Sequence, residues 1–169
     1  MTSAGIVTTL TRQMPKVEST LRQHLLREMR AHGFFAHAVE TFSVKEGVPD
    51  VHFLGHGRCG WIELKQVTVS ARPRAYLPVP LFNQEQRTYL QEYAYKGGLC
   101  YVVIQVRWNY EGAPGPKGVT DCFLCNGRDA ALNLGVTWTP AELVEHAKAM
   151  GQRRFSRAEI PALLRGVQP

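Results

Sequence analysis

The stretch of residues 47–66, GVPDVHFLGHGRCGWIELKQ, constrains the possible folds of this chain more than any other. It consists of two mainly apolar runs on either side of a short His-Gly pair, a pattern that predicts a β-hairpin. Three charged residues, Asp50, Glu63 and Lys65, stand within these runs. Because an unpaired charge is costly to bury, the three side chains are expected to serve a purpose together.

The turn of this hairpin determines which residues lie opposite one another. If Leu54 pairs with Cys59 across a turn at residues 56–57, the antiparallel register places Asp50 directly opposite Glu63. Side chains that lie opposite one another share a face of the sheet. The alternation of a strand adds the lysine two residues after Glu63 to that face, whereas a slip of one residue would separate the carboxylates.

Two carboxylates that face each other repel, and both remain ionised only with a cation between them. Mg²⁺ suits such a site, because it takes one or two protein carboxylates together with waters and phosphate oxygens. The predicted ligands are Asp50, Glu63 and the backbone carbonyl of Leu64, with Mn²⁺ as a substitute ion. Such an ion activates water and polarises a phosphodiester, and Lys65 would orient the water or offset phosphate charge. The alternative is an ion pair of these carboxylates with Lys65 or Arg58 on an exposed hairpin face.

Charge and composition narrow the class of partner. Twenty Lys and Arg residues against fourteen Asp and Glu give a formal charge of +6, which favours a polyanionic partner such as nucleic acid. The 169 residues suit one domain, and no apolar run is long enough to cross a membrane. The first residues lack the pattern of a secretory signal, and four cysteines do not resemble a disulfide framework. We therefore expect a cytoplasmic protein with reduced thiols and no membrane partner.

Helices and strands are predicted on both sides of the hairpin. Apolar residues at helical spacing predict the first helix, and Asn83 is a suitable N-cap for the second. The sequence TPAE at residues 139–142 has the pattern of a helix start. The predicted elements are a helix over 17–32, a strand over 34–43, a helix from Asn83 to residue 95 or 96, a buried strand over 99–106, and a helix from Thr139 to about Met150.

Further candidate contacts lie outside the hairpin face. The proline-containing stretch after Gln66 predicts a long loop, and its Arg72 and Arg74 would suit contacts with DNA phosphates. His52 stands next to Asp50 on the predicted active face and is a candidate for a secondary substrate contact. For each of these arginines the alternative is a solvated basic surface.

The motifs in this chain resemble those of a known family. Pro49-Asp50 followed by Glu63-Leu64-Lys65 resembles the PD-(D/E)XK motif of the restriction-endonuclease-like superfamily. Gln86 resembles the glutamine of the helix that follows this motif in the branch with VRR-NUC domains and archaeal-type Holliday junction resolvases. The resemblance covers about residues 17–106 and leaves 107–169 as a C-terminal extension. It implies an α/β fold in a single domain, with a central mixed β-sheet flanked by α-helices.

The resemblance also implies roles for individual residues. Asp50 and Glu63 would bind the metal, Lys65 would assist the nucleophile, and Gln86 would support the site. An acidic residue of the first helix completes the site in this family, which makes Glu18 a further candidate metal ligand. Glu40 competes with Glu18 for that role, because it lies on the predicted strand that precedes the hairpin.

The resemblance implies an Mg²⁺-dependent DNA endonuclease that is structure-specific for branched or junction DNA, like a Holliday junction resolvase, with a role in recombination or repair. The expected partner is DNA, either duplex, branched or junction. A homodimer would suit the cutting of two strands, and the small size would suit a bacteriophage or mobile-element gene in a prokaryotic cell. One alternative is a nucleic-acid-binding module that keeps the fold without catalysis. Another is a zinc-stabilised domain built on Cys122 and Cys125, although the apolar residues between them favour buried free thiols.

Overall fold

Two strands joined by a tight turn run through the structure, which is a computed structural model. The structure describes residues 16–39, 47–147 and 149–152, and within these the side chains of residues 20–147. Strand β2 (Val51–Gly55) is antiparallel to β3 (Arg58–Val69), and Leu54 lies opposite Cys59, which confirms the predicted register. Gly57 has a φ of 72°, a backbone conformation that glycine adopts without strain.

The hairpin belongs to a mixed sheet that, among the described residues, has six strands in the order β1-β2-β3-β4-β5-β6. Strands β3 and β4 are parallel, whereas the other neighbouring pairs are antiparallel. A parallel pair needs a crossover connection, and helix α2 lies between β3 and β4 in the chain. The remaining strands are β1 (Phe35–Ala38), β4 (Leu99–Trp108), β5 (Thr120–Asn126) and β6 (Ala149–Gln152).

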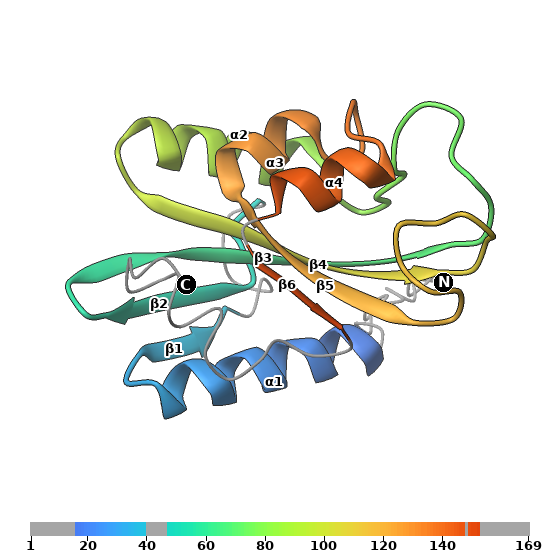
Figure 1. Cartoon of the computed structure of the whole chain (residues 1–169). Coiled ribbons are helices and arrows are strands. Elements are labelled where there is room, and N and C mark those ends of the chain that lie inside the picture. The colour runs from blue at the N-terminus through green and yellow to red at the C-terminus, as the bar shows by residue number, and fades with distance from the viewer. Residues whose placement is uncertain (1–15, 40–46, 148, 153–169) are drawn as a thin grey trace, which may run out of the picture.

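Helices cover both faces of the sheet (Figure 1). Helix α1 packs on one face, against a buried cluster that includes Leu25 and Phe53. The other helices lie on the opposite face, above a second cluster that includes Leu90 and Trp108. The predicted α/β architecture, a central mixed sheet flanked by helices, is therefore confirmed. The helices are α1 (Lys16–Ala31), α2 (Gln84–Tyr95), α3 (Gly127–Asn133) and α4 (Pro140–His146).

The predicted elements agree with the structure over most of their length. The first helix, the helix capped by Asn83 and the buried strand from Leu99 form as expected. Strand β1 ends at Ala38, and residues 40–46 of the predicted strand lie outside the described residues. No described helix is long and apolar enough to cross a membrane.

The helix predicted from Thr139 to about Met150 ends earlier than expected, so this part of the prediction is wrong. Helix α4 begins after the N-cap Thr139 as expected, but it ends at His146, and Ala147 has extended backbone angles. Residues 149–152 instead form β6, which pairs with β5. The short helix α3 was not predicted. The buried core also continues past residue 106, because Phe123, Leu134 and Leu143 all belong to the cluster beneath α2.

Candidate functional site

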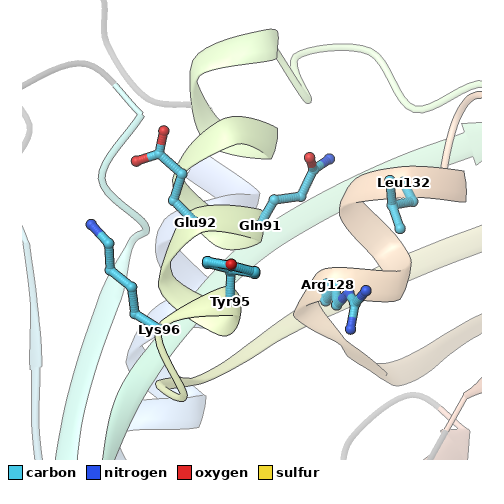
Figure 2. A pocket seen from close by; sticks show the side chains of 6 residues that line it. All are labelled: Gln91, Glu92, Tyr95, Lys96, Arg128 and Leu132. Atoms are coloured by element: carbon cyan, nitrogen blue, oxygen red, sulfur yellow. The ribbon is translucent and has the colours of Figure 1, made fainter.

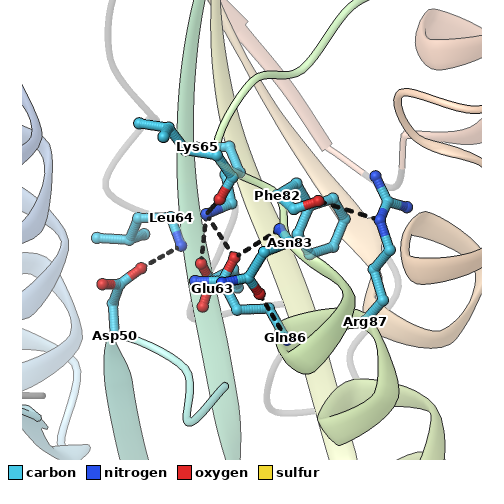
Figure 3. Close-up of polar contacts among 9 residues, drawn as sticks. Asp50, Glu63, Leu64, Lys65, Phe82, Asn83, Gln86 and Arg87 are labelled. Atoms are coloured by element: carbon cyan, nitrogen blue, oxygen red, sulfur yellow. Dashed lines mark hydrogen bonds and ion pairs between the residues drawn. The ribbon is translucent and has the colours of Figure 1, made fainter. Parts of the chain in front are cut away.

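Asp50 lies at the start of β2, beside the strand that carries the other two charges. Its Oδ2 accepts a hydrogen bond of 2.8 Å from the backbone amide of Leu64, the residue between Glu63 and Lys65 (Figure 3). Val51, the next residue, lies opposite Ile62, so Asp50 stands one step along the hairpin, at the level of Glu63. The hairpin register therefore brings Asp50 to the segment that holds Glu63 and Lys65.

Glu63 and Lys65 project from β3 toward α2. Their neighbours Ile62 and Leu64 belong to the cluster beneath α1, and side chains alternate between faces along a strand. The side chains of Glu63 and Lys65 are only 1% and 6% exposed, and Oε1 of Glu63 lies 2.6 Å from Nζ of Lys65. The ion pair considered in the sequence therefore exists for these two residues, but it is buried rather than exposed.

The ammonium group of Lys65 has two further acceptors. It donates to the backbone carbonyl of Leu81 at 2.9 Å and to Oε1 of Gln86 at 3.0 Å. The Phe82 ring centroid lies 5.4 Å from Nζ, within the range of a cation–π contact. With Glu63, these acceptors match the three hydrogens of the ammonium group, which explains how the charge is tolerated in a buried place.

Gln86 connects this lysine to the start of α2. The Asn83 side chain accepts a hydrogen bond from the Gln86 amide at 2.9 Å, and Oε1 of Gln86 accepts from the Asn83 amide at 3.3 Å. This reciprocal pair is a capping box, which satisfies amides that a helix start leaves without partners. Since Oε1 of Gln86 also accepts from Lys65, the cap fixes the helix end relative to β3.

The segment before Asp50 packs against the same helix end. Gly47 has a φ of 92°, and a Cβ atom at this position would lie 2.6 Å from the backbone carbonyl of Glu85. Val48 and Pro49 are both buried. Only glycine fits this close approach of the two backbones. The segment GVPD therefore packs against the first turn of α2 and positions Asp50 there.

Burial dominates the electrostatics of Asp50. Loss of solvent raises the pKa of this carboxyl above its ordinary value, while the Leu64 amide and the charges of Lys65 and Arg22 act in the opposite direction. Ionisation of Asp50 in the folded protein therefore costs free energy. An added cation would favour the ionised form and remove that cost.

The oxygen atoms at this place fit Mg²⁺. In the part of the chain that the structure describes, no group of three or more His, Cys, Asp and Glu side chains forms a metal cage. Mg²⁺ does not need such a cage, because it commonly uses one or two carboxylates and keeps several waters. Asp50 and Glu63 would supply the carboxylates, and Leu64 is held beside them through its amide.

The remaining predicted site residues are spread more widely. Arg72 and Arg74 are exposed in the loop between β3 and α2. The Nε2 atom of His52 lies 3.2 Å from Sγ of Cys59, so its described polar contact is not with Asp50. Glu18 belongs to α1, but its side chain lies outside the described part, as does the whole of Glu40.

Cys122 and Cys125 cannot form one half of a zinc site. Cys122 belongs to the cluster beneath α1 and Cys125 to the cluster beneath α2, so they face opposite sides of β5. Both thiols are buried and free. The preferred prediction of buried free cysteines is confirmed.

Leu81 takes part in the site, although no pattern in the sequence predicts this role. It has a φ of 67°, in the left-handed region that leucine rarely adopts, and its carbonyl is an acceptor for Lys65. Strained backbone of this kind persists only where surrounding contacts hold it. No residue pattern of a loop with three prolines would have identified this carbonyl.

A pocket of about 320 Å³ lies elsewhere, between α2 and α3 (Figure 2). Its lining comes from the exposed side of α2 and from α3, and it includes none of the predicted site residues. The lining residues are Gln91, Glu92, Tyr95, Lys96, Arg128 and Leu132.

Comparison with known proteins finds similarity to solved structures but not to a family model. No family model matches the chain, and no curated protein sequence matches it. The structure is similar to that of Hjc from Archaeoglobus fulgidus, a Holliday junction resolvase from an archaeal hyperthermophile. The TM-score is 0.41 at 19% sequence identity, over 66% of this chain and 74% of that chain.

Proposed function

We propose that this protein is an Mg²⁺-dependent DNA endonuclease whose active site contains Asp50, Glu63 and Lys65. The observation that supports the proposal most strongly is the hydrogen bond from the Leu64 amide to Asp50. It ties one carboxylate to the strand segment that carries the other carboxylate and the lysine. Two buried or half-buried carboxylates beside one lysine, on a basic protein, suit the binding of a metal and a phosphodiester.

Each residue has a distinct part in this proposal. Asp50 and Glu63 would hold the metal with the Leu64 carbonyl. The bound ion would lower the pKa of a water molecule and would place a positive charge beside the phosphate. Lys65 would hold the attacking water or a phosphate oxygen. In the structure its three hydrogens are directed at Glu63, Leu81 and Gln86, so it must exchange one acceptor to do this.

The type of DNA substrate is indicated by the motif resemblance and by exposed basic residues. The resemblance of the motif to that of archaeal-type Holliday junction resolvases supports branched or junction DNA. Arg72 and Arg74, exposed on the loop that leads into α2, would contact phosphates and position the DNA without reading its sequence. Cutting both strands of a junction would require two active sites, which a homodimer provides.

The test is a cleavage assay on linear duplex, single-stranded, flap and four-way-junction DNA, each with Mg²⁺, Mn²⁺ or chelator. We expect the wild type to cut at least one substrate with Mg²⁺ and none with chelator. Asp50→Ala and Glu63→Gln should remove the activity, whereas Glu145→Ala, which changes an exposed carboxylate on α4, should keep it.

Two outcomes would contradict the proposal. One is the absence of cleavage on every substrate with either metal, and the other is equal cleavage by wild type and Asp50→Ala. DNA binding without any cleavage would instead identify a non-catalytic nucleic-acid-binding module.

A further inference from the structure

Aromatic side chains continue the line of the charged residues along both β3 and α2. Trp61 precedes Glu63 by two residues and therefore lies on the same face of β3. Tyr89 and Tyr93 follow Gln86 by three and seven residues, which places them on one side of α2. The ring centroids of Trp61 and Tyr89 are 5.9 Å apart, and those of Tyr89 and Tyr93 are 6.1 Å apart.

The line of rings extends across the neighbouring strands to the edge of the sheet. The centroids of Trp61 and His52 are 4.8 Å apart, those of His52 and His37 are 5.2 Å apart, and those of His37 and Phe35 are 5.5 Å apart. We call these six side chains the aromatic row. Its members are Phe35, His37, His52, Trp61, Tyr89 and Tyr93.

The aromatic row remains accessible to solvent. Phe35 is 66% exposed, His37 is also exposed, and the other four members are partly exposed. By contrast, Trp108 and Trp138 are only 0% and 5% exposed, as expected for tryptophans of the core. Rings that contact one another and keep part of their surface in solvent can offer that surface to a ligand.

The chemistry of the aromatic row favours nucleobases as its ligand. All of its members are planar rings, which stack on bases without regard to sequence. The two histidine rings lie beside the larger aromatic side chains, with His52 between His37 and Trp61.

The position of the aromatic row relates it to the candidate active site. Two residues along a strand correspond to about 7 Å, so Trp61 begins about that far from Glu63. This is roughly the length of two stacked nucleotides, whose rise is about 3.4 Å each. A strand whose phosphate lay at Asp50 and Glu63 could thus place its neighbouring bases on the aromatic row.

We propose that the aromatic row binds unpaired bases next to the phosphate held at Asp50 and Glu63, so that the preferred substrates are DNAs with single-stranded nucleotides, such as flaps and opened junctions. This inference rests on the proposed nuclease function and specifies its substrate. Paired duplex bases are already stacked on one another and would not offer free faces to the row.

A binding experiment with the full chain in chelator tests the inference without cleavage. The probe is a short single-stranded oligothymidylate, and its control is an abasic strand with the same number of phosphates. Trp61 is the partly exposed one of the three tryptophans, so quenching of tryptophan fluorescence reports on the row. We expect quenching and binding with the oligothymidylate, and much weaker binding of the abasic strand.

Substitutions identify the rings responsible. Trp61→Leu and Tyr89→Leu should each weaken binding of the oligothymidylate by about 5- to 100-fold, the usual effect of losing one stacked base. Trp61→Phe keeps a ring and should retain most of the affinity. Tyr95→Leu is the matched control, because Tyr95 is 91% exposed on the same helix but lies outside the row. Thermal unfolding of each variant shows that it is folded.

Three results would overturn the inference. The first is equal binding of the abasic and base-containing strands by the wild type, and the second is unchanged affinity in Trp61→Leu and Tyr89→Leu. The third is a wild-type dimer that dissociates in Trp61→Leu, because a second copy would then cover the row. Since binding is measured in chelator, each of these is distinct from a failure of cleavage, which would count against the nuclease proposal itself.

Discussion

Lys65 donates a hydrogen bond of 3.0 Å to Oε1 of Gln86, and this contact joins the central strand β3 to the first turn of α2. The same oxygen closes the capping box with Asn83. Gln86 therefore both caps the helix and holds the lysine of the candidate active site. The two roles have separate measurements, because the cap contributes to stability and the contact with Lys65 to cleavage.

Replacement of Gln86 by Ala should reduce cleavage more than stability. Loss of the side chain removes one cap hydrogen bond, at a cost of about 1 kcal/mol, and leaves Lys65 without one of its acceptors. Misplacement of a catalytic group commonly costs about 10- to 100-fold in rate. Single-turnover cleavage with Mg²⁺ and urea unfolding measure the two effects.

Gln86→Glu is the matched control for this pair of roles. Glutamate can close a capping box and can accept from Lys65, so the free energy of unfolding should stay close to that of the wild type. If Gln86→Ala cleaves DNA at the wild-type rate, the contact with Lys65 has no part in catalysis.

Asp50→Asn should abolish cleavage without destabilising the metal-free protein. Burial raises the pKa of Asp50 in the folded state, so the ionised carboxylate lowers stability at pH values above that pKa. This cost disappears as the pH falls through the folded pKa, because the folded protein then takes up the proton first. Asparagine cannot ionise and can still accept from the Leu64 amide, so in chelator at pH 7 the variant should unfold at the wild-type temperature or above it.

Mg²⁺ should reverse this order of stability. A ligand that binds only the folded state raises its unfolding temperature, so millimolar Mg²⁺ should stabilise the wild type but not Asp50→Asn. Thermal unfolding with and without the ion measures this difference. Equal stabilisation of both proteins would place the metal elsewhere, and Asp129→Asn, an exposed carboxylate on α3, serves as the control.

The sequence predicts local features of this fold well because their causes are local. The register of the hairpin follows from its turn at residues 56–57 and from the alternation of side chains, and the start of α2 follows from Asn83 and Gln86. The predicted end of α4 was wrong because its cause is not local. Pairing of residues 149–152 with β5, which lies more than twenty residues earlier, decides that end.

The candidate site also has parts that the sequence predicts and parts that it does not. Asp50, Glu63 and Lys65 could be identified because charges inside apolar runs are unusual. Their surroundings could not be predicted, since the carbonyl of Leu81 depends on an unusual backbone conformation in the preceding loop. The contact between Trp61 and Tyr89 likewise depends on how α2 docks on β3.

Arg87→Met should destabilise the protein by about 3 kcal/mol. The buried guanidinium donates to the carbonyls of Phe82 at 3.1 Å, Ala131 at 2.9 Å and Leu134 at 2.7 Å, and thereby ties α2 to α3. Without it, these buried carbonyls lose their partner. Urea unfolding measures the change, and Arg107→Met, at an exposed arginine of β4, should alter stability by no more than about 0.5 kcal/mol.

Only one of the four cysteines should react rapidly with a thiol reagent in the native protein. Cys59 is exposed, whereas the other three are buried. Burial raises the pKa of Cys100 and Cys122 to about 11 and that of Cys125 to about 12, so near pH 8 they are almost wholly in the unreactive thiol form. Labelling with an aromatic disulfide should modify one thiol before unfolding and four afterwards, and Cys59→Ser should show no rapid reaction.

Gly47→Ala should damage the site through the backbone that carries Asp50. Gly47 has a φ of 92°, which alanine rarely adopts. In addition, the new Cβ atom would lie 2.6 Å from the Glu85 carbonyl, so the chain before Asp50 must move away from α2. Gly57→Ala is a matched control, because Gly57 also has a positive φ, of 72°, but no atom lies within 4 Å of the added Cβ. Both variants should lose about 1 kcal/mol from the backbone conformation. Only Gly47→Ala should lose more than that and also lose stabilisation by Mg²⁺, and equal behaviour of the two variants would show that the contact with Glu85 does not position Asp50.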